Sequence, residues 1–156
     1  MIEIYDIKEA KDKAIITETI LRQLPEWFGL EASILDYIDK VKDKLYFVAK
    51  EEDCIIGFIA IALNNQFTAD IYVMGLLKAH QRKGIGKHLV KTVERHLIKE
   101  DFKMLMVKTL GASSNDLSYE KTRQFYKGLG FYPLEEFKEI WDKNNPCLIM
   151  AKSLEL

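Results

Sequence analysis

The sequence has little of what marks secreted, multidomain or fibrous proteins. It contains two cysteines, Cys54 and Cys147, which are too few for a disulfide framework and fit a protein of the reducing cytosol. Both lie in apolar runs typical of strands, so we expect buried thiols that act as small hydrophobic side chains. Only three prolines occur, and no Pro/Gly/Ser-rich linker interrupts the 156 residues. This length without a linker favours a single domain spanning residues 1–156.

Excess charge and long apolar runs are missing as well. The net charge is −1, which gives no overall attraction to nucleic acid or to an anionic membrane. Basic and aromatic residues are rarely interleaved, which also disfavours a nucleic-acid partner. No apolar run approaches the ~18 residues of a membrane span, and the N-terminus lacks the pattern of a signal peptide. We therefore expect a cytoplasmic protein without nucleic-acid or membrane partners.

The hydrophobic periodicity predicts alternating strands and helices. Strands are expected at residues 2–5, 45–49, 54–63, 67–77, 102–109, 131–141 and 147–152. Helices are expected at residues 9–24, 30–42, 84–100 and 118–129. The three strands of residues 45–77 form an antiparallel meander, and the strand–helix–strand step of residues 67–109 is a parallel crossover. The prediction is an α/β (α+β) domain with one mixed, mostly antiparallel sheet of six to seven strands and about four helices on both faces.

The strongest chemical signal is a glycine-rich turn between a predicted strand and a predicted helix. It reads Gln81-Arg82-Lys83-Gly84-Ile85-Gly86-Lys87. The first turn of a helix has unpaired N–H groups and the positive end of the helix dipole, and glycines allow an anion to approach the backbone. The turn therefore predicts a phosphate site. The glycine spacing fits neither a P-loop nor a dinucleotide-binding fingerprint.

Two motifs together resemble the GNAT N-acetyltransferase superfamily. Gln81, Gly84 and Gly86 stand at the fixed positions of its Gln/Arg-x-x-Gly-x-Gly/Ala motif for acyl-CoA. Residues 122–131, with Tyr126 in their middle, resemble the second signature of the family, and the order of elements agrees over nearly the whole chain. The resemblance implies the acyl-CoA N-acyltransferase fold and acetyl-CoA as co-substrate.

The same resemblance implies the cofactor-binding residues. Backbone amides of the turn would hold the pyrophosphate; the residues assigned to this turn are Gln81, Arg82, Lys83, Gly84, Ile85, Gly86 and Lys87. Leu76 and Leu77 would lie where the strand pairs with pantetheine, between two strands that the family splays apart. The family often has Asn seven residues before the signature tyrosine, and Tyr119 stands there in this sequence. Asn115, slightly upstream, is a candidate substitute.

Direct attack of an amine on a thioester needs a base, an oxyanion donor and an acid. Tyr126 aligns with the family's general acid, although a helix-stripe aromatic of the core would have the same spacing. Asp70 is the candidate base, the alternative being a solvated carboxylate at the start of a strand. The backbone N–H near Leu76 is the expected oxyanion donor. Strict alternation would place Asp70, Tyr72 and Leu76 on one face of their strand.

The acceptor side is expected near Trp27 and Phe28, in the loop between the first two helices. Large aromatics in a loop suggest a pocket wall, and packing against the sheet edge is the alternative. Tyr72 could orient the substrate. The expected acceptor is a small-molecule primary amine; a protein acetyltransferase and a non-catalytic acyl-CoA-binding module remain alternatives, as does an acyl group longer than acetyl. Apolar edge strands near the C-terminus could pair across a homodimer.

Overall fold

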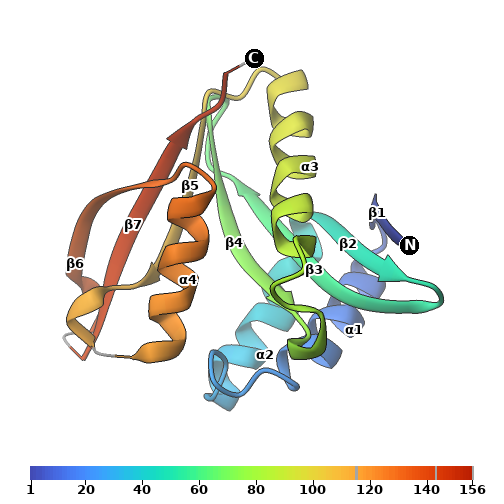
Figure 1. Ribbon diagram of the computed structural model, residues 1–156, viewed down its shortest axis with the longest axis horizontal. Helices are drawn as coiled ribbons and strands as arrows, with labels where there is room; N and C mark the ends of the chain where they lie inside the picture. Colours follow the sequence, from blue (N-terminus) through green and yellow to red (C-terminus); the bar gives the residue numbers. More distant parts are fainter. Residues whose placement is uncertain (115, 143, 156) are drawn as a thin grey trace.

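The computed structural model describes residues 1–114, 116–142 and 144–155, and these form seven strands and four α-helices around one sheet (Figure 1). The strands are β1 (Ile2–Asp6), β2 (Leu45–Glu51), β3 (Cys54–Leu63), β4 (Thr68–Leu76), β5 (Met104–Leu110), β6 (Tyr132–Asp142) and β7 (Asn145–Ser153). The helices are α1 (Ala10–Leu21), α2 (Glu31–Lys40), α3 (Ile85–Lys99) and α4 (Leu117–Gly128). The predicted order of elements is confirmed. None of the described helices is long and apolar enough to cross a membrane.

The sheet has the strand order β1-β2-β3-β4-β5-β7-β6, and neighbouring strands are antiparallel except for the parallel pair β4 and β5. The mixed, mostly antiparallel sheet is therefore confirmed. The parallel pair is short, because it joins only Thr68–Ile71 to Met104–Val107. Beyond Ile71 and Val107 the two strands separate, and Figure 1 shows them diverging toward the N-terminal end of α3.

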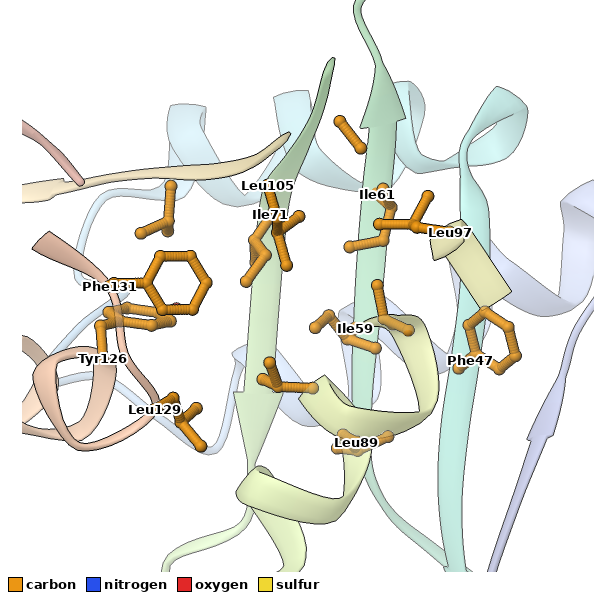
Figure 2. Packing of buried hydrophobic residues seen from close by; sticks show 14 of the residues in the cluster. Phe47, Ile59, Ile61, Ile71, Leu89, Leu97, Leu105, Tyr126, Leu129 and Phe131 are labelled. Carbon is orange, nitrogen blue, oxygen red and sulfur yellow. The ribbon is translucent and has the colours of Figure 1, made fainter. Parts of the chain in front are cut away.

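Helices cover both faces of the sheet, as predicted. On one face α3 buries Leu89, Val90, Val93 and Leu97, whose helical spacing gives one continuous apolar stripe. These side chains lie over β3, and Tyr126, Leu129 and Phe131 extend the same core toward α4 (Figure 2). The other face carries α1 and α2, with Ile20, Leu21 and Leu24 packed against Tyr46 and Phe58. The two cores hold the sheet from both sides up to the point where β4 and β5 separate.

A β-bulge in β4 changes which face its side chains occupy. The register with β3 passes from the pair Ile61–Ile71 to the pair Ala60–Val73, so Tyr72 is an extra residue. Tyr72 packs with the α1 and α2 core, whereas Met74 and Leu76 pack with the α3 core. The expectation that strict alternation puts Asp70, Tyr72 and Leu76 on one face is therefore wrong. The bulge lies next to the separation of β4 and β5, where it aims Tyr72 toward α2.

The two cysteines differ from expectation in one case. Cys147 is buried in β7, as predicted, but Cys54 is exposed at the start of β3. Cys54 follows the polar turn between β2 and β3, and its apolar neighbours begin only at Ile55 and Ile56. The apolar run therefore marked the strand correctly and overestimated the burial of its first residue.

The edge strand β6 is exposed along almost its whole length. Tyr132, Leu134, Ile140 and Trp141 are large apolar side chains open to solvent on it. An apolar edge strand with unpaired backbone groups is a feature that proteins normally cover. Pairing of β6 across a homodimer stays a prediction.

Candidate active site

The turn between β4 and α3 has the backbone shape of an anion cradle. Arg82 and Gly84 both adopt left-handed conformations, with φ of 63° and 82°. The His88 amide donates to the Gly84 carbonyl at 3.0 Å, which is the first intrahelical bond of α3. The amides of Ile85, Gly86 and Lys87 precede it and have no acceptor within the helix. Arg82, Gly84 and Lys87 are exposed, so an anion can reach these N–H groups.

Gln81 ties this turn to the end of β4. Its Nε2 donates to the Leu76 carbonyl at 2.8 Å. The Leu77 amide donates to the Ile56 carbonyl of β3 at 2.9 Å and is therefore committed to the sheet. Because neighbouring residues of a strand direct their amides to opposite sides, the Leu76 amide faces the gap left by β5. Of the two residues predicted to pair with pantetheine, only Leu76 has its amide free for this purpose.

A cavity of about 1580 Å³ occupies the gap between the separated strands. Its walls come from β4, β5, the α1–α2 loop, α2, the turn before α3, α4 and, at Trp141, β6. The predicted site residues that line it are Trp27, Phe28, Asp70, Tyr72, Leu76, Gln81, Arg82, Gly84, Gly86, Lys87, Tyr119 and Tyr126. Leu77, Lys83 and Ile85 do not line it, and Ile85 is buried in the core beneath α3. Asn115 lies outside the described residues.

Tyr126 lies in the wall of this cavity and is only 6% exposed. Its ring meets Phe125 and Phe131 edge to face, with centroids 5.2 and 5.4 Å apart. Figure 2 shows it beside Phe131 at the α4 end of the core. Burial raises the pKa of Tyr126 well above its usual range, and the nearby Tyr119 and Asp70 add to the effect. The phenol therefore stays protonated at neutral pH and can donate a hydrogen bond into the cavity.

The position of Tyr126 is set by local contacts at both ends of α4. Asp116 caps the N-terminus by accepting from the Ser118 amide at 2.9 Å. The buried Arg123 donates to the Leu110 carbonyl at 2.6 Å, which attaches the helix to the end of β5. Gly130, with φ of 95°, follows the last turn in the left-handed conformation expected from the sequence. These contacts fix the helix on the β5 side of the cavity.

Asp70 is a buried carboxylate, 7% exposed, at the point where the strands separate. Lys108 of β5 donates to its Oδ2 from Nζ at 2.8 Å. Burial raises the pKa of Asp70, and the hydrogen bond and charge of Lys108 act in the opposite direction. The alternative of a solvated carboxylate at the start of a strand is therefore wrong. Ala69 and Ile71 belong to the α3 core. Because successive side chains of a strand point to opposite faces, the Asp70 side chain lies on the α1 and α2 face.

The α1–α2 loop is joined to α4 across the cavity. The Trp27 indole N–H donates to Thr122 Oγ1 at 3.1 Å and to the Ser118 carbonyl at 3.3 Å. In return the Tyr119 hydroxyl donates to the Trp27 carbonyl at 2.9 Å. We call these contacts of Trp27 with Ser118, Tyr119 and Thr122 the loop–α4 clasp. The hydroxyl of Tyr119 is thus engaged with the protein, in contrast to the cofactor contact predicted for this position.

Aromatic side chains form the wall on the α2 side. Phe28 meets Tyr37 edge to face with centroids 5.8 Å apart, and Tyr37 meets Tyr72 in the same way at 5.4 Å. All three line the cavity. Burial raises the pKa of Tyr72 to about 12, so its hydroxyl is neutral at physiological pH. Phe28 therefore lines the cavity, and Tyr37 and Tyr72 lie beside it in the same wall. The orientation of a substrate by Tyr72 stays a prediction.

Comparison with known proteins decides the family. Residues 13–131 match the model of the acetyltransferase (GNAT) family. The chain belongs to this family. It is also 28% identical over 125 residues to an uncharacterised N-acetyltransferase of Chlorobaculum tepidum, a match that covers 78% of this chain and 72% of the relative. The protein is thus a GNAT-family N-acetyltransferase, and the resemblance of the two sequence motifs is confirmed.

Solved structures share the fold of this acetyltransferase. An aminoglycoside 6'-N-acetyltransferase complexed with coenzyme A superposes with a TM-score of 0.75 at 14% identity, covering 99% of this chain and 98% of the other. The ribosomal-protein-S18-alanine N-acetyltransferase from Escherichia coli superposes with a TM-score of 0.77 at 16% identity, covering 100% and 96%. One of these acts on a small molecule and the other on a protein. At such identities the likeness shows the fold alone.

Two polar groups of the acetyltransferase site escaped sequence reasoning. Lys108, the partner of Asp70, lies 38 residues away in the chain. Thr109 is buried in the cavity wall, and its hydroxyl has no hydrogen-bond partner among the described residues. Val107 and Thr109 alternate along β5 onto the α3 side of the gap. The signal in the sequence that could have indicated Lys108 and Thr109 as site residues was their position at the end of a strand that faces the predicted gap.

We expect Thr109→Val to stabilise the protein. The buried Thr109 hydroxyl has no hydrogen-bond partner among the described residues, so its loss should raise the free energy of unfolding by about 1 kcal/mol. Thermal melts of the variant and the wild type measure the effect. A lower melting temperature of the variant would contradict it.

Gly86 leaves no room for a side chain beneath the glycine-rich turn. A Cβ atom at this residue would lie 3.1 Å from the Phe125 ring, whose other neighbour is Tyr126. We expect Gly86→Ala to displace Phe125 into the gap and to raise the Kd for coenzyme A about tenfold, or ~1.4 kcal/mol. Gly128→Ala is the matched control, because no atom lies within 4 Å of a Cβ there. Equal affinities of the two variants in calorimetric titration would contradict the predicted cofactor position.

Proposed function

We propose that this acetyltransferase moves an acetyl group from acetyl-CoA to the primary amine of a small molecule by direct attack. The observation that carries the proposal is the loop–α4 clasp. It joins the α1–α2 loop to α4 over the gap between β4 and β5 by three hydrogen bonds. A peptide acceptor requires an open groove at this place, and the clasp crosses it; a small amine requires no such groove.

The cofactor side of the proposal rests on how well the chain fits acyl-CoA. The free amides of Ile85, Gly86 and Lys87 suit a pyrophosphate. The Leu76 amide faces the gap between β4 and β5 and suits the pantetheine arm. Acetyl-CoA would supply an activated thioester carbonyl farther along this gap.

Asp70 and Lys108 would prepare the acceptor. An amine attacks only when neutral, so the site must remove a proton from the ammonium form. Asp70 lies on the α1 and α2 face, beside the aromatic wall, and its raised pKa makes it a better base than an exposed aspartate. Lys108 keeps a useful fraction of the carboxylate ionised in its buried position. Asp70 is therefore the proton acceptor, directly or through one water.

Tyr126 and a backbone N–H near Leu76 would assist the cleavage of the thioester. In the reaction a C–N bond forms, the C–S bond breaks and the sulfur gains the electron pair of that bond. A backbone N–H near Leu76 would stabilise negative charge on the carbonyl oxygen. The Tyr126 hydroxyl would give its proton to the leaving thiolate and would later regain one from solvent. Burial raises the pKa of the phenol, and the same apolar surroundings would also raise the proton affinity of a thiolate leaving beside it.

A thiol-release assay with acetyl-CoA tests this proposal. A panel of small primary amines should release coenzyme A well above the rate of hydrolysis, and peptides with a free α-amine or lysine should not. Release with peptides only would replace the proposal by a protein acetyltransferase, and binding without release would replace it by an acyl-CoA-binding module. Propionyl-CoA in the same assay tests the acyl length. We place the reaction in the cytoplasm, where free thiols such as Cys54 and Cys147 persist.

A further inference from the structure

We propose that the acceptor is an arylalkylamine, that is, one primary amine on a flat and otherwise uncharged aromatic body. Polyamines and aminoglycosides should be poor acceptors. This inference rests on the proposed function and narrows it to one class of amine. It follows from the shape of the aromatic wall and from the pairing of the charges around the acceptor side of the cavity.

The aromatic wall is built from three separate elements. Phe28 comes from the α1–α2 loop, Tyr37 from α2 and the bulged Tyr72 from β4. Their mutual edge-to-face contacts hold the rings in fixed orientations. A planar aromatic substrate can complete such a set by further offset or edge-to-face contacts, each worth roughly 0.5–1.5 kcal/mol beyond burial. The wall lies on the same face as Asp70, so the ring and the amine of one molecule can reach both.

The carboxylates around the cavity are already neutralised by lysines. Glu26 is paired with Lys78, Asp36 with Lys40 at 2.9 Å, and Asp70 with Lys108 at 2.8 Å. Glu120, exposed on α4, is the one lining carboxylate without an ion pair among the described residues. A substrate with several ammonium groups would need several free carboxylates to replace its lost hydration.

One face of the Tyr72 ring is already in use as a cation site. The Lys44 ammonium lies 5.1 Å from the centroid of this ring, and Lys44 is also paired with Asp43 at 2.8 Å. A second cation therefore cannot take this place on the ring. The reacting amine gives its proton to Asp70 and is then uncharged, whereas further ammonium groups would stay charged beside carboxylates that are already paired.

This inference departs from what the fold would suggest. The aminoglycoside 6'-N-acetyltransferase that superposes on this chain acts on a substrate class with several amines. Fold does not set the acceptor, because the acceptor is recognised by side chains that differ between two proteins at 14% identity. The paired carboxylates and the aromatic wall of this chain are such side chains.

Specificity constants at saturating acetyl-CoA test the acceptor class. We expect kcat/KM for 2-phenylethylamine and tryptamine to exceed the values for spermidine and kanamycin at least tenfold. Ethylamine should be acetylated with a much higher KM, because it has an amine and no ring. A preference for spermidine or kanamycin overturns the acceptor class while leaving the proposed function intact. Acetylation of peptides in place of every small amine overturns the proposed function as well.

Two sets of variants test the two observations separately. Tyr37→Leu should raise KM for 2-phenylethylamine about tenfold and KM for ethylamine by a much smaller factor, and Tyr5→Leu on β1 is the control. Lys40→Gln combined with Lys78→Gln frees two carboxylates at half-exposed positions, where neither change threatens folding. This pair should raise kcat/KM for spermidine at least fivefold, and Lys42→Gln, outside the cavity, should not. Unchanged specificity in both sets contradicts the inference.

Discussion

Replacement of Tyr126 by phenylalanine is expected to lower kcat about a hundredfold, the lower range for loss of a general acid. KM for acetyl-CoA should change little, because the ring keeps its edge-to-face contacts with Phe125 and Phe131. The reason is chemical: the hydroxyl is protonated, lines the cavity and has no described partner that it would abandon. Steady-state rates with a small amine measure the effect.

The control for this change is Tyr132→Phe. Tyr132 lies on the exposed strand β6 and is 73% exposed, so its hydroxyl should contribute nothing to turnover. A loss of kcat in Tyr126→Phe with an unchanged melting temperature would locate the effect in the chemical step. Unchanged turnover in this variant would remove Tyr126 from the mechanism and leave it as a core aromatic residue.

Replacement of Asp70 by asparagine is expected to lower kcat/KM for the amine about a hundredfold. The amide keeps the shape of the side chain and cannot take a proton from an ammonium group. Activity of the wild type should fall as the pH falls through the pKa of Asp70, which burial has raised above the usual aspartate range. The acidic limb of the pH–rate profile should be flattened in Asp70→Asn. A preserved acidic limb would show that another group is the base.

Lys108 provides an independent test of the same pair. Its ammonium stabilises the ionised form of Asp70, so Lys108→Met should raise the pKa of Asp70 further and move the acidic limb to higher pH. Lys108→Arg keeps the positive charge and should leave the acidic limb near its wild-type pH. Lys103→Met, at an exposed position just before β5, should not move the limb either. The other groups that act on Asp70 or feel its charge are Asn64 in the β3–β4 turn, Cys147 in β7 and Tyr126 in α4. None of these is altered in the comparison, so a limb that does not move would contradict the pairing.

Much of the fold was predictable because its signals are local. Hydrophobic periods of two and of 3.6 residues marked the strands and helices in their correct order. Gly84 and Gly130 both have positive φ. Glycine adopts this conformation without steric cost, so a glycine at the start of a predicted helix and one just after another indicate such turns. An isolated glycine within a predicted strand, Gly57, is a further local signal, because such a glycine indicates close approach of another chain segment; a Cβ there would lie 2.9 Å from Leu76.

The rest of the site was beyond sequence reasoning because its contacts are not local. The bulge at Tyr72 depends on the register with β3 and leaves no compositional mark in β4. The ion pair of Asp70 and the loop–α4 clasp join residues 38 and 91–95 positions apart. In α2 the apolar Leu35 is exposed, whereas the more polar Tyr37 packs toward the cavity. Only the packed tertiary structure determines which of these neighbours is turned inward.

Calorimetric titration of the purified wild-type enzyme with coenzyme A tests the central claim most directly. If the amides before His88 receive the diphosphate and the arm passes between the two separated strands, heat should be released at one equivalent of ligand. The melting temperature of the protein should rise with ligand concentration. No heat and no thermal protection at millimolar ligand would show that this opening in the sheet serves some other purpose.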